Sequence, residues 1–200
     1  MKEKMVKKDC GKGVVFLDRD GVINRDSPDY IRSVSDFHFI PGSAEAIGKL
    51  FAAGLDVILI TNQSVINRGW VTEEKLSDIF QHLCQGVALF GGKIKDIFYC
   101  PHRPDEGCSC RKPGPGLFFQ AEKKHGMDLS ESIMVGDSAK DMQAAEAAGV
   151  GRKILVKTGN GQKDMAFLKK NGPLPDYLAE DLADAVDRIL SGSVFSCKKY

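Results

Sequence analysis

Two aspartates stand two positions apart directly after a short apolar segment. The run GVVFLD ends at Asp18, and Asp20 follows it within the tetrapeptide DRDG. A carboxylate at the end of a buried strand could attack phosphorus and form an aspartyl-phosphate, which divides hydrolysis into two steps. The second carboxylate could protonate the leaving oxygen and then activate water. The pair predicts phosphoryl transfer, with Asp18 as the nucleophile and Asp20 as the general acid and base.

Two carboxylates beside a phosphate repel one another, and a hard cation would relieve that repulsion. Mg²⁺ takes oxygen ligands and is commonly bound by one or two carboxylates and a substrate phosphate. Asp137, directly after the run SIMVG, could complete a site with Asp18 and Asp20. Thr61 offers a hydroxyl to a phosphate oxygen, and Lys112 offers a positive charge to the transition state. Each signal is weak alone, because Asp137 could be a helix N-cap and Lys112 a surface lysine.

Three cysteines and one histidine fall between residues 100 and 110. They are Cys100, His102, Cys108 and Cys110. A tetrahedral Cys₃His set without an open position is typical of structural zinc. The alternative is a set of free thiols beside a loop histidine, and a redox role is disfavoured because the segment has no Cys-x-x-Cys motif. Since Cys110 precedes Lys112 by two residues, a zinc-pinned loop would position Arg111 and Lys112 over the phosphate.

The segments that carry these residues alternate between strand-like and helix-like patterns. Strands are predicted at 13–18, 56–60, 95–99, 132–135 and 153–156, and helices at 42–53, 72–89, 116–125, 140–148 and 181–190. This alternation predicts an α/β fold with a mostly parallel sheet covered by helices on both faces. Asp18, Thr61, Cys100 and Asp137 all lie at or just past strand ends. In parallel sheets, ligands bind at the edge formed by the carboxyl ends of the strands, so these residues should converge there.

The composition predicts one compact domain at 13–191, between a flexible arm at 1–12 and a tail at 192–200. With 28 basic and 27 acidic residues the net charge is +1, which gives no reason to expect nucleic acid or an anionic membrane as a partner. The basic start is not followed by a long apolar stretch, and no segment approaches the roughly 20 apolar residues of a membrane span. We therefore expect a cytoplasmic monomer.

The ordered motifs Asp-x-Asp-Gly, Thr-Asn, Lys-Pro and Gly-Asp-Ser-x-x-Asp resemble those of the haloacid dehalogenase (HAD) superfamily of phosphohydrolases, over roughly residues 14–156. The resemblance implies a three-layer Rossmann-like fold and a magnesium-dependent phosphoric monoester hydrolase. It implies that Asp20 binds Mg²⁺ through its backbone carbonyl, that Asp137 is a metal ligand, and that Asp141 orients waters or the lysine. No large cap domain is inserted between the motifs, so the site should be open, with specificity resting on short loops.

Two branches of this superfamily carry a short zinc loop, the heptose-1,7-bisphosphate 7-phosphatases and the histidinol-phosphate phosphatases. The sequence looks more like the first, in DRDGVIN from residue 18, TNQSVINRG from residue 61 and CRKPGPG from residue 110. That likeness implies hydrolysis of the C7 phosphate of D-glycero-D-manno-heptose 1,7-bisphosphate, a step toward lipopolysaccharide precursors. The alternative substrates are histidinol phosphate and other small sugar phosphates.

The likeness also implies a set of substrate contacts. They are Asp26, Asn62, Gln63, Ser64 and Arg111. The planar fork of Arg111 suits a second phosphate, which it could bind through two parallel hydrogen bonds. Val65 is a departure, because the heptose branch usually has glycine there, and the loop 26–30 differs as well. Both departures concern the contacts that would select the sugar.

Other classes of function remain open alternatives. A phosphate-binding module that has lost catalysis is disfavoured by the intact Asp18 and Asp20. A phosphotransferase or phosphomutase would share the nucleophile, but such enzymes commonly use a cap that excludes water. A zinc-finger nucleic-acid binder is disfavoured because no basic helix follows the cysteine cluster.

Overall fold

The computed structural model describes residues 13–192, so the predicted arm at 1–12 and the tail beyond residue 192 lie outside the described residues. Within that range six parallel strands form one sheet in the order β3-β2-β1-β4-β5-β6. The strands are β1 (Val14–Leu17), β2 (Asp56–Asn62), β3 (Asp96–Cys100), β4 (Ile133–Gly136), β5 (Arg152–Val156) and β6 (Tyr177–Ala179). The order reverses beside β1, which places β1 at the centre of the sheet.

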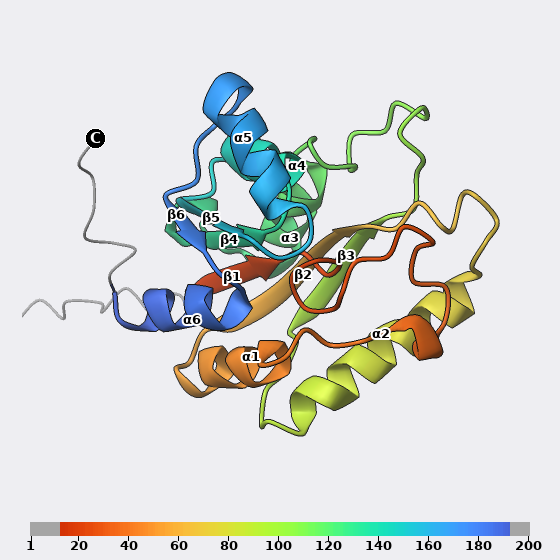
Figure 1. Ribbon diagram of the computed structural model, residues 1–200, viewed down its shortest axis with the longest axis horizontal. Helices are drawn as coiled ribbons and strands as arrows, with labels where there is room; N and C mark the ends of the chain where they lie inside the picture. Colours follow the sequence, from red (N-terminus) through yellow and green to blue (C-terminus); the bar gives the residue numbers. More distant parts are fainter. Residues whose placement is uncertain (1–12, 193–200) are drawn as a thin grey trace, which may run out of the picture.

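Among the described residues, six α-helices cover the sheet in two layers (Figure 1). They are α1 (Ser43–Ala52), α2 (Glu73–Ala88), α3 (Gly116–His125), α4 (Ala139–Ala148), α5 (Gly161–Asn171) and α6 (Leu182–Leu190), with short 3₁₀ turns η1 (Val34–Asp36) and η2 (Leu129–Glu131). Helices α1, α2 and α6 share one apolar cluster with the sheet, and α3, α4 and α5 share the other. The sheet is therefore the middle of three layers.

The alternation of side chains along β1 explains why both faces are covered. Val15 and Leu17 belong to the cluster under α1, α2 and α6, whereas Val14 and Phe16 belong to the opposite one. Phe16 also meets Phe118 of α3 edge to face, with ring centres 5.0 Å apart. Burying a side chain of this size contributes roughly 1.5–3 kcal/mol. A strand that is apolar at every position can be stable only with a layer on each face.

The α/β fold class predicted from the sequence is confirmed, and each predicted strand and helix has a counterpart in the structure. Two elements were not predicted, α5 and β6. Helix α5 buries only Gly161 and Leu168, so its sequence lacks the apolar period of a packed helix. Strand β6 has three residues at the edge of the sheet, too few to show a period. Among residues 13–192, no helix is long and apolar enough to cross a membrane.

Candidate active site

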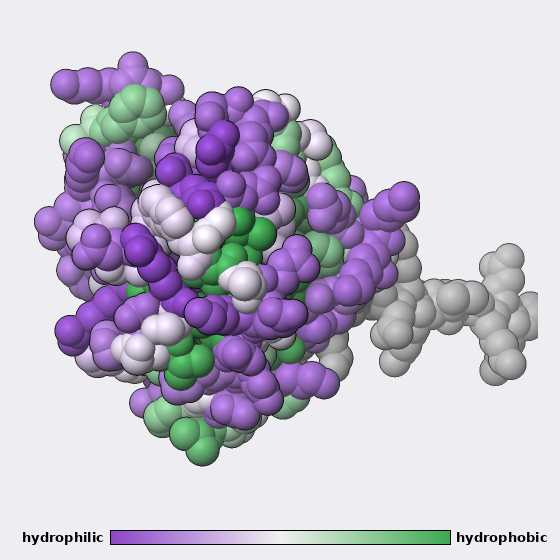
Figure 2. All heavy atoms as spheres, turned by 90° about the vertical axis from the view of Figure 1, so that its right-hand side faces the viewer, coloured by the Kyte–Doolittle hydropathy of each residue, from purple (hydrophilic) through white to green (hydrophobic). Residues whose placement is uncertain are grey.

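The carboxyl ends of the strands carry the residues predicted to do chemistry. Asp18 directly follows β1 and is held at the sheet by a hydrogen bond from its N–H to the carbonyl of Val135 in β4, at 3.0 Å. Thr61 lies near the end of β2, and Asp137 directly follows β4. The three loops that leave this edge, at residues 25–40, 62–72 and 101–115, lie on the right-hand side of Figure 1. Figure 2 looks onto that side, where hydrophilic side chains surround a smaller apolar area.

Lys112 joins two of the carboxylates. Its Nζ lies 3.0 Å from Asp18 Oδ1 and 2.5 Å from Asp141 Oδ1, and it donates a hydrogen bond to the carbonyl of Ile60 at 2.8 Å. Burial disfavours the charged lysine, but the two carboxylates outweigh that effect and raise the pKa of Lys112. The ammonium group is therefore a fixed positive charge beside Asp18.

The carboxylate cluster carries more negative charge than Lys112 can balance. Oxygen atoms of Asp18, Asp137 and Asp141 lie within 4.8 Å of one another. Burial, followed by repulsion from Asp141, raises the pKa of Asp18 to about 6, although Lys112 opposes the shift. Burial, followed by repulsion from Asp141 and from Asp18, raises the pKa of Asp137 to about 8. A buried group of oxygen ligands with this excess of negative charge fits Mg²⁺.

Asp20 lies in a different electrostatic setting. Its carboxylate accepts hydrogen bonds from the buried Arg19 at 2.8 Å and 3.1 Å, from Asn24 Nδ2 at 2.8 Å and from Gln63 Nε2 at 3.0 Å. Burial alone would raise its pKa, but the charge and hydrogen bonds of Arg19 and the two amides lower it. Gln63 Nε2 also lies 3.0 Å from Thr61 Oγ1, so one amide links Asp20 to the end of β2.

The segment after β5 closes around Asp137. Asn160 donates to Asp137 Oδ2 from its backbone N–H at 2.8 Å and from its side chain at 3.3 Å. Thr158 Oγ1 donates to the carbonyl of Gly21 at 2.6 Å. A Cβ atom at Gly159 would lie 2.1 Å from Asp137 Oδ2, and one at Gly21 would lie 2.3 Å from it. Both glycines also have positive φ, so this close approach requires a residue without a side chain.

The Cys-His cluster has the geometry of a tetrahedral site. Cys110 Sγ lies 3.3 Å from Cys100 Sγ and from His102 Nδ1, and 3.6 Å from Cys108 Sγ. Cys100 Sγ lies 3.5 Å from His102 Nδ1 and 3.6 Å from Cys108 Sγ. Zinc–sulfur bonds of about 2.3 Å give a tetrahedron with edges of about 3.8 Å. The four donors therefore surround a space that fits Zn²⁺ with only a small expansion.

Asn62 connects the zinc loop to the sheet. Its side-chain Nδ2 donates to the carbonyl of Lys112 and its Oδ1 accepts from the N–H of Lys112, both at 3.1 Å. This pair of hydrogen bonds fixes the backbone of Lys112 beside β2. On the other side of the loop, Arg111 donates to the carbonyl of His102 at 2.9 Å. The backbone near Lys112 is therefore held both by the sheet and by the Cys-His cluster.

The residues predicted to contact substrate lie in unlike surroundings. Gln63 and Ser64 are buried at the edge of the site, whereas Asp26 is exposed and lies 3.3 Å from Asn160 Nδ2. Val65, the departure from glycine, is buried with Val71 and Leu76 in a small apolar cluster. Its side chain thus anchors the loop rather than facing the carboxylates.

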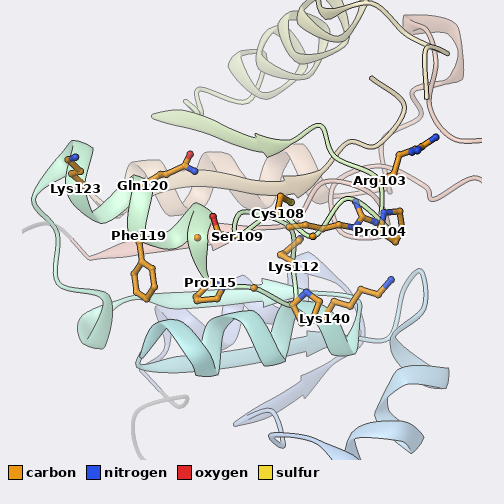
Figure 3. A pocket seen from close by; sticks show the side chains of 15 residues that line it. Arg103, Pro104, Cys108, Ser109, Lys112, Pro115, Phe119, Gln120, Lys123 and Lys140 are labelled. Carbon is orange, nitrogen blue, oxygen red and sulfur yellow. The ribbon is translucent and has the colours of Figure 1, made fainter. Parts of the chain in front are cut away.

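A groove of about 790 Å³ lies beside the carboxylate cluster (Figure 3). Lys112 and Arg111 contribute to its wall, together with Phe119 and Lys123 of α3, and Lys140 at the start of α4. None of the carboxylates lines it. This groove therefore flanks the predicted reaction centre instead of containing it.

Sequence reasoning missed three residues that hold this centre together, namely Arg19, Asn24 and Asn160. Arg19 lies between Asp18 and Asp20 in the sequence, but the sequence does not show that its side chain is buried. Asn160 reaches Asp137 because segments 23 residues apart pack together, whereas Asn24 contacts Asp20 from four residues further along the same loop. Of the predicted residues, Asp18, Asp137 and Asp141 have carboxylate oxygens within 4.8 Å of one another at this edge of the sheet.

Comparison with known proteins gives consistent results. A family model for HAD-hydrolase-like proteins matches residues 109–185. The chain is 41% identical over 179 residues to the D-glycero-beta-D-manno-heptose-1,7-bisphosphate 7-phosphatase of Bordetella bronchiseptica, covering 88% of this chain and 97% of that protein. It is 47% identical over 155 residues to the enzyme of that name from Vibrio cholerae, covering 74% and 83% of the two chains.

A solved structure extends the likeness to three dimensions. The crystal structure of the D,D-heptose 1,7-bisphosphate phosphatase from B. bronchiseptica, complexed with magnesium and phosphate, superposes with a TM-score of 0.85 at 40% sequence identity. The match covers 90% of this chain and 98% of the other. The likeness therefore includes nearly the whole of the described fold.

Proposed function

This chain belongs to the D-glycero-β-D-manno-heptose-1,7-bisphosphate 7-phosphatase family of HAD-like hydrolases, and we propose that it removes the C7 phosphate of that heptose bisphosphate. The observation that carries the proposal is the Asp18–Lys112–Asp141 arrangement at the end of β1, where a carboxylate stands beside a buried ammonium group. The family members named above support the choice of substrate. A heptose-phosphate substrate would place the enzyme in the cytoplasm.

Asp18 is the proposed nucleophile. Its carboxylate oxygen attacks phosphorus, the bond between phosphorus and the C7 oxygen breaks, and an aspartyl-phosphate forms on Asp18. The pKa of about 6 means that Asp18 is mainly ionised near neutral pH, as attack requires. Lys112 and the hydroxyl of Thr61 stabilise the charge that develops on the phosphoryl oxygens. A second attack, by water on phosphorus, releases phosphate and regenerates the carboxylate.

Asp20 is the proposed proton carrier for both steps. It gives a proton to the leaving C7 oxygen and then takes one from the attacking water. The Arg19 fork and the two amides lower the pKa of Asp20, which favours the ionised state needed to accept a proton from water. To donate in the first step Asp20 has to carry a proton, so its carboxyl must move away from Arg19.

Magnesium would be held by Asp18, Asp137 and the backbone carbonyl of Asp20. Asp141 would orient Lys112 through their ion pair. Bound there, the cation supplies positive charge that offsets the repulsion between these acids and the substrate phosphate. The two hydrogen bonds from Asn160 both go to Asp137 Oδ2, so they fix the direction in which Oδ1 points. Zinc at the Cys-His cluster has a structural role in this proposal, because all of its ligands come from the protein.

We propose that substrate specificity comes from the loops around this edge, through Asp26, Asn62, Gln63, Ser64 and Arg111. Of these, Asn62 acts by holding the Lys112 backbone, and Gln63 by orienting Asp20 and Thr61. The chain is proposed to act as a monomer, since every residue named in the reaction comes from one chain.

The test is a phosphate-release assay with Mg²⁺ on both anomers of the heptose 1,7-bisphosphate, histidinol phosphate and fructose 1,6-bisphosphate. We expect the highest kcat/KM for a heptose bisphosphate, and the product should retain its C1 phosphate. A clear preference for histidinol phosphate would replace the proposed substrate while keeping the chemistry. Absence of phosphate release from every compound would reject the phosphatase.

A further inference from the structure

Two arginines and two aromatic residues form a cluster on loops that border the site. Arg32 lies with its guanidinium carbon 4.7 Å from the centre of the Trp70 ring, and Arg68 lies 5.1 Å from the same ring and 5.7 Å from Tyr30. The Tyr30 and Trp70 rings meet edge to face at 5.2 Å. We call Tyr30, Arg32, Arg68 and Trp70 the arginine–aromatic cluster. None of these residues has been assigned a role above.

The cluster brings two positive charges together. Because each guanidinium carbon lies within about 5 Å of the Trp70 ring centre, the two carbons lie within about 10 Å of each other. Among residues 13–192, no carboxylate lies within 4.0 Å of either guanidinium group. Asp36 is close, but it accepts from the backbone N–H of Arg32, at 3.1 Å. An anion bound between two such charges would stabilise both of them.

The stacking also decides what kind of ligand fits. An arginine that lies over an aromatic face keeps its N–H edge free, and it loses little further freedom when that edge binds a phosphate. Arg32 uses its Nε for the carbonyl of Asp29 at 2.8 Å, and Arg68 makes a longer contact to Ser64 Oγ at 3.4 Å. The terminal nitrogens of both side chains remain for a ligand. A phosphate group, with several oxygens that accept hydrogen bonds, matches these terminal nitrogens.

The backbone connects the cluster to a loop that carries a residue of the site. Tyr30 has φ +62°, and it is the single non-glycine residue with positive φ among those described. Such strained positions concentrate at ligand-binding sites. Arg68 and Trp70 belong to the turn that begins at Ser64 and is anchored by the buried Val65, whose carbonyl accepts from Trp70 at 3.0 Å. The residue before Ser64 is Gln63, whose amide contacts Asp20.

We propose that Arg32 and Arg68 bind the phosphate that stays on the sugar while the C7 phosphate reacts at Asp18. The inference rests on the proposed function, and it names the residues that make the enzyme prefer a bisphosphate to a monophosphate. Trp70 and Tyr30 are positioning residues, since they hold the two guanidinium groups in place. This proposal gives the second phosphate, which the sequence likeness assigned to Arg111, to Arg32 and Arg68 instead.

The first test uses Trp70 as its own reporter, because the chain has 1 tryptophan. In the Asp18→Asn protein with Mg²⁺, the heptose 1,7-bisphosphate should give a saturable change in tryptophan fluorescence. The heptose 7-phosphate should need at least about tenfold more ligand for the same change, because it lacks the distal phosphate. Equal titration curves for the two ligands would overturn the proposal.

The second test is kinetic. Arg32→Gln and Arg68→Gln should each raise KM for the heptose bisphosphate about tenfold, with kcat within about twofold, because each loses a charged hydrogen bond to the bound phosphate. The ratio of kcat/KM for the bisphosphate to that for p-nitrophenyl phosphate should fall by the same factor. Arg188→Gln is the matched control, since Arg188 stacks on Tyr177 at 4.8 Å on a distant helix.

The outcomes separate this inference from the function on which it rests. If both arginine variants keep the wild-type KM, or if Arg111→Gln alone carries the whole loss of bisphosphate preference, the arginine–aromatic cluster does not bind the distal phosphate. If the wild-type protein fails to hydrolyse the heptose bisphosphate, the proposed function falls. The fluorescence titration can then still be run with fructose 1,6-bisphosphate. A saturable change that Arg32→Gln weakens about tenfold supports a phosphate site at the arginine–aromatic cluster, and no change rejects it.

Discussion

The Cys-His cluster and the carboxylate cluster lie at the same edge of the sheet but are built in different ways. All four zinc-ligand candidates come from one short segment, residues 100–110, which runs from the last residue of β3 into the following loop, whereas Asp18, Asp137 and Asp141 come from two strand ends and a helix. The loop brings its donors together through local turns. The carboxylates meet only after the parallel sheet has formed. Changes in the two clusters should therefore have different effects on stability and on kcat.

The two clusters are also coupled. Lys112 belongs to the loop by sequence and to the carboxylate cluster by contact, and Asn62 holds it to β2 through two hydrogen bonds of 3.1 Å. A defect in the zinc cluster can thus reach the reaction centre through the backbone of Lys112. The reverse route is weaker, because removing a carboxylate changes no contact among the zinc ligands.

The largest expected effect follows from removing the nucleophile. Asp18→Asn should lower kcat by more than about 10⁴-fold, since the amide cannot form the aspartyl-phosphate. Zinc content should stay near one ion per chain, because no zinc-ligand candidate contacts Asp18. The measurements are phosphate release and metal analysis on the same preparation. Substantial turnover in this variant would reject Asp18 as the nucleophile, and loss of zinc would reject the independence of the two clusters.

The next prediction tests the coupling by changing the Cys-His cluster. Cys108→Ser should reduce bound zinc to well below one ion per chain and lower Tm by several degrees, since a tetrahedral site loses a thiolate ligand. We also expect kcat to fall about tenfold or more as Lys112 loses its support. Cys84→Ser is the control, because Cys84 is a partly buried thiol of α2 outside the cluster.

A Cys108→Ser protein with full zinc and full activity would mean that the four donors do not form a metal site. A protein that loses zinc and keeps its kcat would mean that Asn62 alone is enough to hold Lys112. Either result can be read from metal analysis, thermal unfolding and steady-state kinetics.

Asn62→Ala isolates the link itself. It removes two hydrogen bonds to the Lys112 backbone, each worth roughly 0.5–1.5 kcal/mol, so kcat should fall about tenfold while zinc content stays unchanged. KM should change less, because the substrate phosphate is bound by other groups. Asn62→Asp keeps the acceptor for the Lys112 N–H and should recover part of the loss. A variant in which KM rises and kcat is unaffected would show that Asn62 acts through the substrate.

The same contrast explains which features the sequence could predict. The Cys-His cluster was visible because its four members fall within one short segment, and they do lie together. The strand ends were visible because apolar runs stop at polar residues, which located Asp18, Thr61 and Asp137. Their role in catalysis stays a prediction.

The features that stayed hidden depend on packing between distant segments. Asn160 reaches Asp137 only because the β5–α5 loop folds back over Gly21, and the twin arginines meet only over Trp70. Arg19 looked like an ordinary charged residue, yet it is 1% exposed and holds Asp20. The spacing of residues along the chain shows neither the burial of Arg19 nor the contacts between the distant segments.

The smallest expected effect lies at the opposite end of β3 from Cys100. Asp96 starts that strand, and its carboxylate contacts Lys124 at 2.7 Å and His125 at 2.8 Å. Burial opposes ionisation, but these two neighbours outweigh it and lower the pKa of Asp96 below its usual value of 3.8. A lowered pKa in the folded state stabilises the protein above the unfolded pKa, and that stabilisation is lost as pH falls through the folded value.

Asp96→Asn should therefore lower Tm slightly near pH 6, and the difference from wild type should shrink as pH falls below about 4. Both kcat and zinc content should be unchanged, because Asp96 touches neither cluster. Thermal unfolding at several pH values, run beside phosphate release and metal analysis, checks all three. A change in kcat would show that the amino end of β3 transmits strain to the zinc loop at its carboxyl end, and the two clusters would then depend on one strand as well as on Lys112.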